Sequence, residues 1–118
     1  MTHKDLDVWK RSIELVTKIY KISESFPEEE KFGIINQMRR SAVSVPSNIA
    51  EGASRGGTNE YIRFLNIASA SLSELDTQLV ISIKLGFCLE DNVPLDDLEI
   101  ISKMLYKLKK SLDKRRNS

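Results

Sequence analysis

The sequence is poor in the residues that make turns, disulfides and metal sites. Its 118 residues include five glycines, three prolines, one cysteine and one histidine. So few turn formers argue against a β-sandwich or β-barrel, which needs a turn signal about every 8–12 residues. Cys88 alone cannot form an intrachain disulfide, and His3 alone cannot supply the paired Glu-x-x-His elements of a di-metal bundle. Because Cys88 also lacks a histidine base other than His3, we expect no metal, no cofactor and no enzymatic activity.

Long apolar runs and an excess of charge of one sign are also missing. Eighteen basic and seventeen acidic residues leave a formal charge of +1, which attracts nucleic acid or a membrane surface only weakly. No stretch approaches the roughly 18 apolar residues that a bilayer span requires. The first ten residues are charged and contain no apolar core of the kind found in secretory signals. We therefore expect a cytoplasmic protein that does not bind membranes.

Apolar residues are instead arranged in four runs with a helical period. They recur at steps of three and four, which places them on one stripe of an α-helix. The runs predict helices over residues 5–25, 28–55, 58–86 and 95–114, and short breaks between them favour an all-α, up-down antiparallel four-helix bundle occupying residues 1–118 as a single domain. The expected core stripes are Leu6, Trp9, Ile13, Val16 and Tyr20; Ile35, Met38, Ala42, Val45 and Ile49; Tyr61, Leu65, Ala68, Leu72, Leu75 and Leu79; and Leu98, Ile101, Leu105, Leu108 and Leu112. In this arrangement Trp9 lies at the heart of the bundle.

Two prolines bear on the second helix. Pro27 suits the first turn of that helix, where its missing N–H costs nothing, and Glu28 to Glu30 then lie at the positive end of the helix dipole. Pro46 falls inside the apolar pattern, where it removes a backbone donor and crowds the carbonyl four residues earlier. Because the pattern continues through Ile49, we expect a helix kinked at Pro46 rather than one that ends before it.

The outward faces of the second and third helices are rich in small side chains, unlike the charged outward faces of the other two. Small residues allow another backbone to approach closely, and arginine is favoured over lysine at interfaces. We therefore expect these faces to contact other copies of the chain, at Arg40, Ser44, Ser47, Asn48, Glu51, Ala70, Ser73 and Glu74. The alternative is a monomer with a serine-rich surface.

Two groups of basic residues are candidates for nucleic-acid binding, because clusters of arginine and lysine bind phosphate backbones. One group borders the small-residue faces, and the other lies near the C-terminus: Arg39, Arg40, Arg55 and Arg63; and Lys107, Lys110, Lys114, Arg115 and Arg116. The alternative for Arg39 and Arg40 is pairing with carboxylates of another subunit. The alternative for the second group is to complement the negative end of its helix. We expect no aromatic stacking platform beside either group.

The segment QMRRSAVSVPSNIAEG, residues 37–52, closely resembles the signature of the 23S rRNA-intervening-sequence proteins, a family of bacterial four-helix bundles. Matching pairs are spread along the chain, among them Val8-Trp9, Ile19-Tyr20, Phe26-Pro27, Phe64-Leu65 and Glu74-Leu75. The resemblance implies an up-down bundle that assembles as a ring-like homopentamer without catalytic residues. The family is also similar to the accessory proteins of diversity-generating retroelements, which bind reverse transcriptase and nucleic acid through a basic surface.

Residues and resemblance together lead us to expect a non-enzymatic, homo-oligomeric helical scaffold. The resemblance makes RNA or a nucleic-acid enzyme its candidate partner. The alternative is a purely structural oligomer that has no nucleic-acid role.

Overall fold

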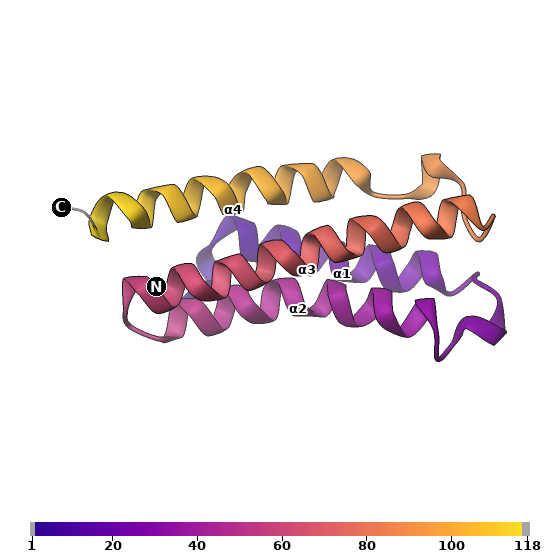
Figure 1. The fold of residues 1–118 in the computed structure, drawn as a ribbon, viewed down its shortest axis with the longest axis horizontal. Helices are drawn as coiled ribbons and strands as arrows, with labels where there is room; N and C mark the ends of the chain where they lie inside the picture. The colour runs from indigo at the N-terminus through magenta and orange to yellow at the C-terminus, as the bar shows by residue number, and fades with distance from the viewer. Residues whose placement is uncertain (1, 117–118) are drawn as a thin grey trace.

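The computed structural model describes residues 2–116, which fold into an up-down bundle of long helices (Figure 1). Each helix contacts the next along the chain, and the last returns to contact the first. The molecule is elongated, with extents of 51 × 22 × 20 Å. The predicted all-α four-helix bundle is confirmed. Its helices are α1 (Asp7–Ser23), α2 (Ile34–Ser54), α3 (Thr58–Lys84) and α4 (Leu95–Arg116), accompanied by the short 3₁₀-helices η1 (His3–Asp5), η2 (Glu28–Glu30) and η3 (Glu90–Asn92).

The second helix begins six residues later than the predicted start at residue 28. Pro27 precedes the separate 3₁₀-helix η2, and the chain leaves the helical conformation at Gly33, with φ −105° and ψ −118°. A side chain at Gly33 would come within 2.9 Å of Glu30 Oε1. That carboxylate oxygen accepts a hydrogen bond from the N–H of Ile34, so it caps the first turn of α2.

Pro46 lies inside α2, which continues without a break to Ser54. The prediction that the helix continues through Pro46 is therefore confirmed. Pro46 is buried, as are Ala42 and Val45 beside it and Ile49 one turn on. Buried apolar residues thus lie both before and after Pro46, which lacks the backbone N–H that the other helix residues donate.

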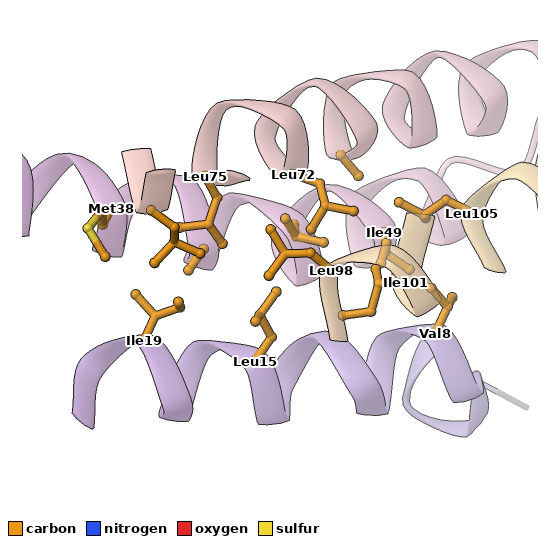
Figure 2. Close-up of a cluster of buried hydrophobic side chains, with 14 of the residues drawn as sticks. Val8, Leu15, Ile19, Met38, Ile49, Leu72, Leu75, Leu98, Ile101 and Leu105 are labelled. Atoms are coloured by element: carbon orange, nitrogen blue, oxygen red, sulfur yellow. The ribbon is translucent and has the colours of Figure 1, made fainter. Parts of the chain in front are cut away.

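The core consists of aliphatic side chains from all four helices, and Figure 2 shows how they interleave. The predicted stripes of α2, α3 and α4 are buried, except that Tyr61 and Leu108 are only partly covered.

In α1 the buried stripe differs from the prediction by one position. The residues that face the core are Val8, Ser12, Leu15, Ile19 and Ser23. Ser12 and Ser23 are small, and their hydroxyls donate to the carbonyls of Trp9 (2.7 Å) and Ile19 (2.8 Å), so the core accommodates them without an unpaired donor.

The neighbouring stripe of α1, which includes Ile13 and Tyr20, lies to one side and remains partly exposed. The prediction that Trp9 occupies the heart of the bundle is therefore wrong. Trp9 is half-buried at the edge of the core and makes an edge-on contact with the His3 ring at 5.3 Å.

Candidate interaction surfaces

The displaced stripe of α1 forms an apolar face together with α2, which we call the α1–α2 face and define by Trp9, Ile13, Val16, Tyr20 and Val43. Ile13, Tyr20 and Val43 are 38%, 41% and 40% exposed. The core assignment is therefore wrong for Ile13 and Tyr20, whereas Leu6, Trp9 and Val16 are partly buried and pack against the core.

Arg39 of α2 joins the two helices within this face. Its guanidinium lies 4.5 Å from the centroid of the Tyr20 ring, and it donates from Nε to Ser23 Oγ (2.9 Å) and from Nη2 to the Tyr20 carbonyl (3.3 Å). Val43 follows Arg39 by one helical turn and therefore lies on the same side of α2. Arg39, a predicted nucleic-acid residue, is engaged within its own chain.

The small polar residues of α2 and α3 meet along a second surface, the α2–α3 seam, defined by Ser41, Ser44, Asn48, Ser71 and Glu74. Ser41 Oγ donates to Glu74 Oε1 at 2.8 Å, and the hydroxyls of Ser44 and Ser71 lie 2.8 Å apart. Asn48 Nδ2 donates to the carbonyl (2.8 Å) and hydroxyl (2.9 Å) of Ser44. Small side chains here let α2 and α3 of one chain approach each other, and this pair makes the most extensive helix contact in the bundle.

The other predicted interface residues lie on the outer surface of the same two helices. Arg40, Ser47, Ala70 and Ser73 are exposed, and Glu51 forms an ion pair with Arg55 at 2.7 Å. The predicted interface set therefore divides into residues that serve the seam inside the chain and residues that remain available to a neighbour.

Arg55 and Arg63 are both engaged near the start of α3. Their guanidiniums lie 5.1 Å and 4.5 Å from the centroid of the Phe64 ring. Arg63 Nε is 3.0 Å from Glu60 Oε1, and this hydrogen bond lowers the pKa of Glu60 and raises the pKa of Arg63. Cation–π contact and ion pairing thus engage both arginines within their own chain.

The basic residues near the C-terminus fall into two sets. Arg116 pairs with Asp113 at 2.6 Å and reaches Asn59, and Arg115 lies close enough to Tyr61 for its charge to oppose the rise in pKa that burial causes there. By contrast, Lys107, Lys110 and Lys114 are exposed, and none forms an ion pair with the described residues 2–116.

Those three lysines share one side of α4, which we call the α4 lysine face, because steps of three and four residues keep side chains aligned. Tyr106 belongs to this face. Its side chain is 61% exposed, and Lys110 Nζ lies 5.7 Å from the centroid of its ring. The described structure thus places one exposed aromatic ring beside these lysines.

A surface hollow lies at the end of the bundle, between the end of α1 and the α3–α4 connection, with a volume of about 840 Å³. Cys88 lines it, and partial burial raises the pKa of its thiol. A raised pKa reduces the thiolate fraction and therefore the nucleophilicity of the sulfur. Within residues 2–116, no cluster of histidine, cysteine and carboxylate side chains is suited to hold a metal ion. No helix in that range has the length and apolarity needed to cross a bilayer.

The arrangement of four helices, seam and signature segment agrees with the comparison to protein families. The model of the family described as 23S rRNA-intervening sequence protein matches residues 4–107. The chain belongs to this family. In this chain the signature segment, residues 37–52, is most of α2. It supplies core residues, the seam residues Ser41, Ser44 and Asn48, and Gly52 at the close approach to α3.

Among the solved structures that are similar to this chain, one matches over nearly its whole length. It is a crystal structure of a protein of unknown function from the S23 ribosomal protein family of Bacteroides thetaiotaomicron. The two share 25% sequence identity with a TM-score of 0.62, over 89% of this chain and 94% of the other. No curated protein is significantly similar to the chain.

Proposed function

We propose that this protein is a non-enzymatic scaffold that assembles with copies of itself and binds RNA. The observation that carries the proposal is the α1–α2 face. Single exposed apolar residues are common on proteins, but Ile13 and Tyr20 lie on one stripe of α1, and Arg39 contacts Tyr20 from α2, where Val43 follows one turn later. A contiguous apolar patch of this kind is typical of a protein–protein contact, because its burial removes apolar surface from water.

A closed ring requires two different faces of each chain. The α1–α2 face offers bulky side chains, and the outer residues of α2 and α3, Ser47, Ala70 and Ser73, offer small ones. Bulky side chains of one copy pack well against a surface of small residues on the next. We propose a homopentamer, the number that the family resemblance implies, and a cytoplasmic location.

RNA is the proposed partner of the α4 lysine face. Three lysines without an ion pair in the described chain attract phosphates, and the exposed ring of Tyr106 offers a surface on which a base can stack. Each chain carries a formal charge of only +1, but a ring repeats the lysine face on every subunit. Several weak contacts on one RNA then add up to measurable avidity. The alternative function, a purely structural oligomer, does not include RNA binding.

The self-association is tested by placing a charge on the α1–α2 face. Ile13→Asp should split the assembly while the helix content measured by circular dichroism is kept, because the carboxylate would have to be desolvated on association. Ser102→Asp adds the same charge on exposed α4 and should leave the assembly intact. Light scattering that shows the unmutated protein to be a monomer at micromolar concentration would refute the proposal.

The RNA role is tested by fluorescence anisotropy with labelled single-stranded RNA. Binding should weaken steeply as salt rises, because association releases counterions. Lys107→Ala with Lys114→Ala should lower the salt slope, whereas Lys103→Ala, at a lysine already paired with Glu99, should change it less. An intact oligomer that binds no RNA at low salt would leave the structural oligomer as the function.

A further inference from the structure

The end of the bundle that holds the α1–α2 and α3–α4 connections exposes large apolar side chains to water. Figure 1 shows both connections together at this end, which we call the connection end and define by residues 21–34 and 84–97. Phe32, Leu89 and Leu85 are 87%, 71% and 60% exposed. Such a concentration of apolar groups on the surface is typical of a contact with a partner.

The turn after α3 explains why two of these leucines face water. Gly86 has φ 79°, a conformation that residues with a side chain rarely adopt, and the Phe87 N–H donates back to the last turn of α3. The Phe87 ring then lies 5.6 Å, centroid to centroid, from the ring of Phe26 in the α1–α2 connection. Phe87 thus joins the two connections, and Leu85 and Leu89 on either side of it remain exposed.

The hollow of about 840 Å³ lies at the connection end and is lined by both apolar and acidic side chains. Ile22, Phe87 and Val93 are among its apolar residues, and Asp91 and Asp96 are exposed at its edge. Neither aspartate forms an ion pair with the described residues 2–116. The other charged residues of the lining are Lys18 and Asp97, which pair with each other, and Lys21.

The charge of the connection end identifies the kind of partner that fits it. Residues 21–34 and 84–97 hold eight acidic and three basic side chains, which gives a net charge of −5. This charge repels RNA and the surface of an anionic membrane, and it attracts a basic polypeptide. The exposed phenylalanine and leucines require that the partner also contribute apolar side chains.

A second copy of the chain meets only one of these two requirements. At the opposite end of the bundle, residues 2–10, 51–63 and 106–116 hold ten basic and five acidic side chains, a net charge of +5. The only large apolar side chain exposed within these ranges is Tyr106, which belongs to the α4 lysine face. The charges therefore match, but the apolar surfaces do not.

We propose that the connection end binds a lysine- or arginine-rich amphipathic helix of another protein. An apolar side chain of that helix enters the hollow against Phe87, Leu89 and Val93, and its cations meet Asp91 and Asp96 at the edge. The site shares no residue with the α1–α2 face or with the α4 lysine face. It therefore goes beyond the proposed function and does not depend on it.

Fluorescence anisotropy with a labelled peptide of leucine and lysine tests the proposal. The peptide has about 14 residues, and its leucines are spaced to share one helical face. It should bind the unmutated full chain with one peptide per chain, and more weakly as salt rises. Peptides with glutamate in place of lysine, or with serine in place of leucine, should bind at least about tenfold more weakly. The proposal is overturned if the leucine–lysine peptide does not bind, or if the serine peptide binds equally well.

A pair of matched variants locates the apolar contact. Leu89→Ser should weaken peptide binding about tenfold, because it removes an apolar side chain from the lining of the hollow. Ile67→Ser makes a similar change at an exposed residue of α3 outside the hollow and should leave the affinity unchanged. Circular dichroism verifies that both variants are folded. Equal affinity in Leu89→Ser and the unmutated chain would place the peptide elsewhere and overturn the proposal.

A second pair of variants tests the charges at the edge of the hollow. Asp91→Asn with Asp96→Asn should make peptide binding less dependent on salt, whereas Glu14→Gln with Asp76→Asn, outside the connection end, should not. An unchanged salt dependence in the first variant would contradict the proposed contact. Ile13→Asp should bind the peptide with unchanged affinity, which separates a failure of this site from a failure of self-association.

The other occupants of an apolar surface give different results with the same variant. Sedimentation with phosphatidylcholine vesicles that Leu89→Ser abolishes would assign the connection end to a membrane. Self-association that is lost in Leu89→Ser but kept in Ile13→Asp, measured by light scattering, would assign it to a second copy. Either result would overturn the proposal.

Discussion

At Gly52, α2 and α3 come so close that no side chain fits between them. A Cβ atom at this position would lie 2.9 Å from Phe64 Cβ and 3.2 Å from the Tyr61 carbonyl oxygen. Both neighbours belong to α3, and one of them is backbone, so relief requires the helices to move apart. The glycine of the signature segment therefore sets the spacing between α2 and α3.

Gly52→Ala should destabilise the protein by about 1–3 kcal/mol, the usual cost of overpacking. Urea denaturation followed by circular dichroism measures it. Gly57→Ala is the matched control, since a Cβ there meets nothing within 4 Å and the backbone has an ordinary extended conformation. An equal loss in both variants would contradict the close approach at Gly52.

Cys88 is the residue whose environment argues most directly against covalent catalysis. Burial raises the pKa of its thiol, so less thiolate is present near pH 7 than in a free cysteine. Alkylation by iodoacetamide at neutral pH, followed by mass spectrometry, should be slower for Cys88 than for glutathione. Alkylation faster than that of glutathione would indicate an activated thiol and contradict the raised pKa.

The raised pKa of the Cys88 thiol makes the folding stability depend on pH. The folded state keeps the Cys88 proton to higher pH than the unfolded state does, so folding stability falls as pH rises above the unfolded pKa of about 8.5. Cys88→Ser should flatten that part of the stability profile, measured by urea denaturation across this alkaline range. A profile that is unchanged by the substitution would contradict the raised pKa.

At the scale of the element, α1 shows what periodicity can and cannot decide. Two neighbouring stripes of this helix both step by three and four residues, and the more apolar of them contains Trp9, Ile13 and Tyr20. Spacing and hydrophobicity favoured that stripe, but the core receives the one with Ser12 and Ser23. The serines pair with backbone carbonyls of their own helix, so their burial costs little. The small size of these residues was the signal available in the sequence.

Because Leu15 rather than Ile13 faces the core, truncating these two residues of similar size should cost different amounts of stability. Leu15 is fully buried, so Leu15→Ala should cost about 2–5 kcal/mol. Ile13 is partly exposed, and Ile13→Ala should destabilise the dissociated chain by much less. Denaturation in urea at low protein concentration, where the free chain predominates, compares them. A larger loss for Ile13 would restore the original assignment of the core.

The other helices were predictable because each has one apolar stripe. The stripes of α2, α3 and α4 identified the core almost completely, and their continuity across Pro46 correctly indicated an unbroken α2. The start of α2 was missed because Pro27 and three glutamates make a strong helix start, whereas the break lies at Gly33.

At the scale of the whole molecule, the sequence predicted which helix faces carry small residues but not which neighbour each face meets. Ser44 and Ser71 approach each other inside one chain, and Ala70 and Ser73 remain on the surface. The way the helices pack around the bundle decides this, and helical periodicity does not contain that information. Tyr106 and Lys110, by contrast, lie four residues apart on one predicted helix, so periodicity alone is enough to place them side by side.

Native mass spectrometry of the unmutated protein is the most direct test of the proposed homopentamer. We expect a dominant species with the mass of five chains of 13.4 kDa each, and its replacement by single chains in Ile13→Asp. A dominant single-chain mass for the unmutated protein would contradict it.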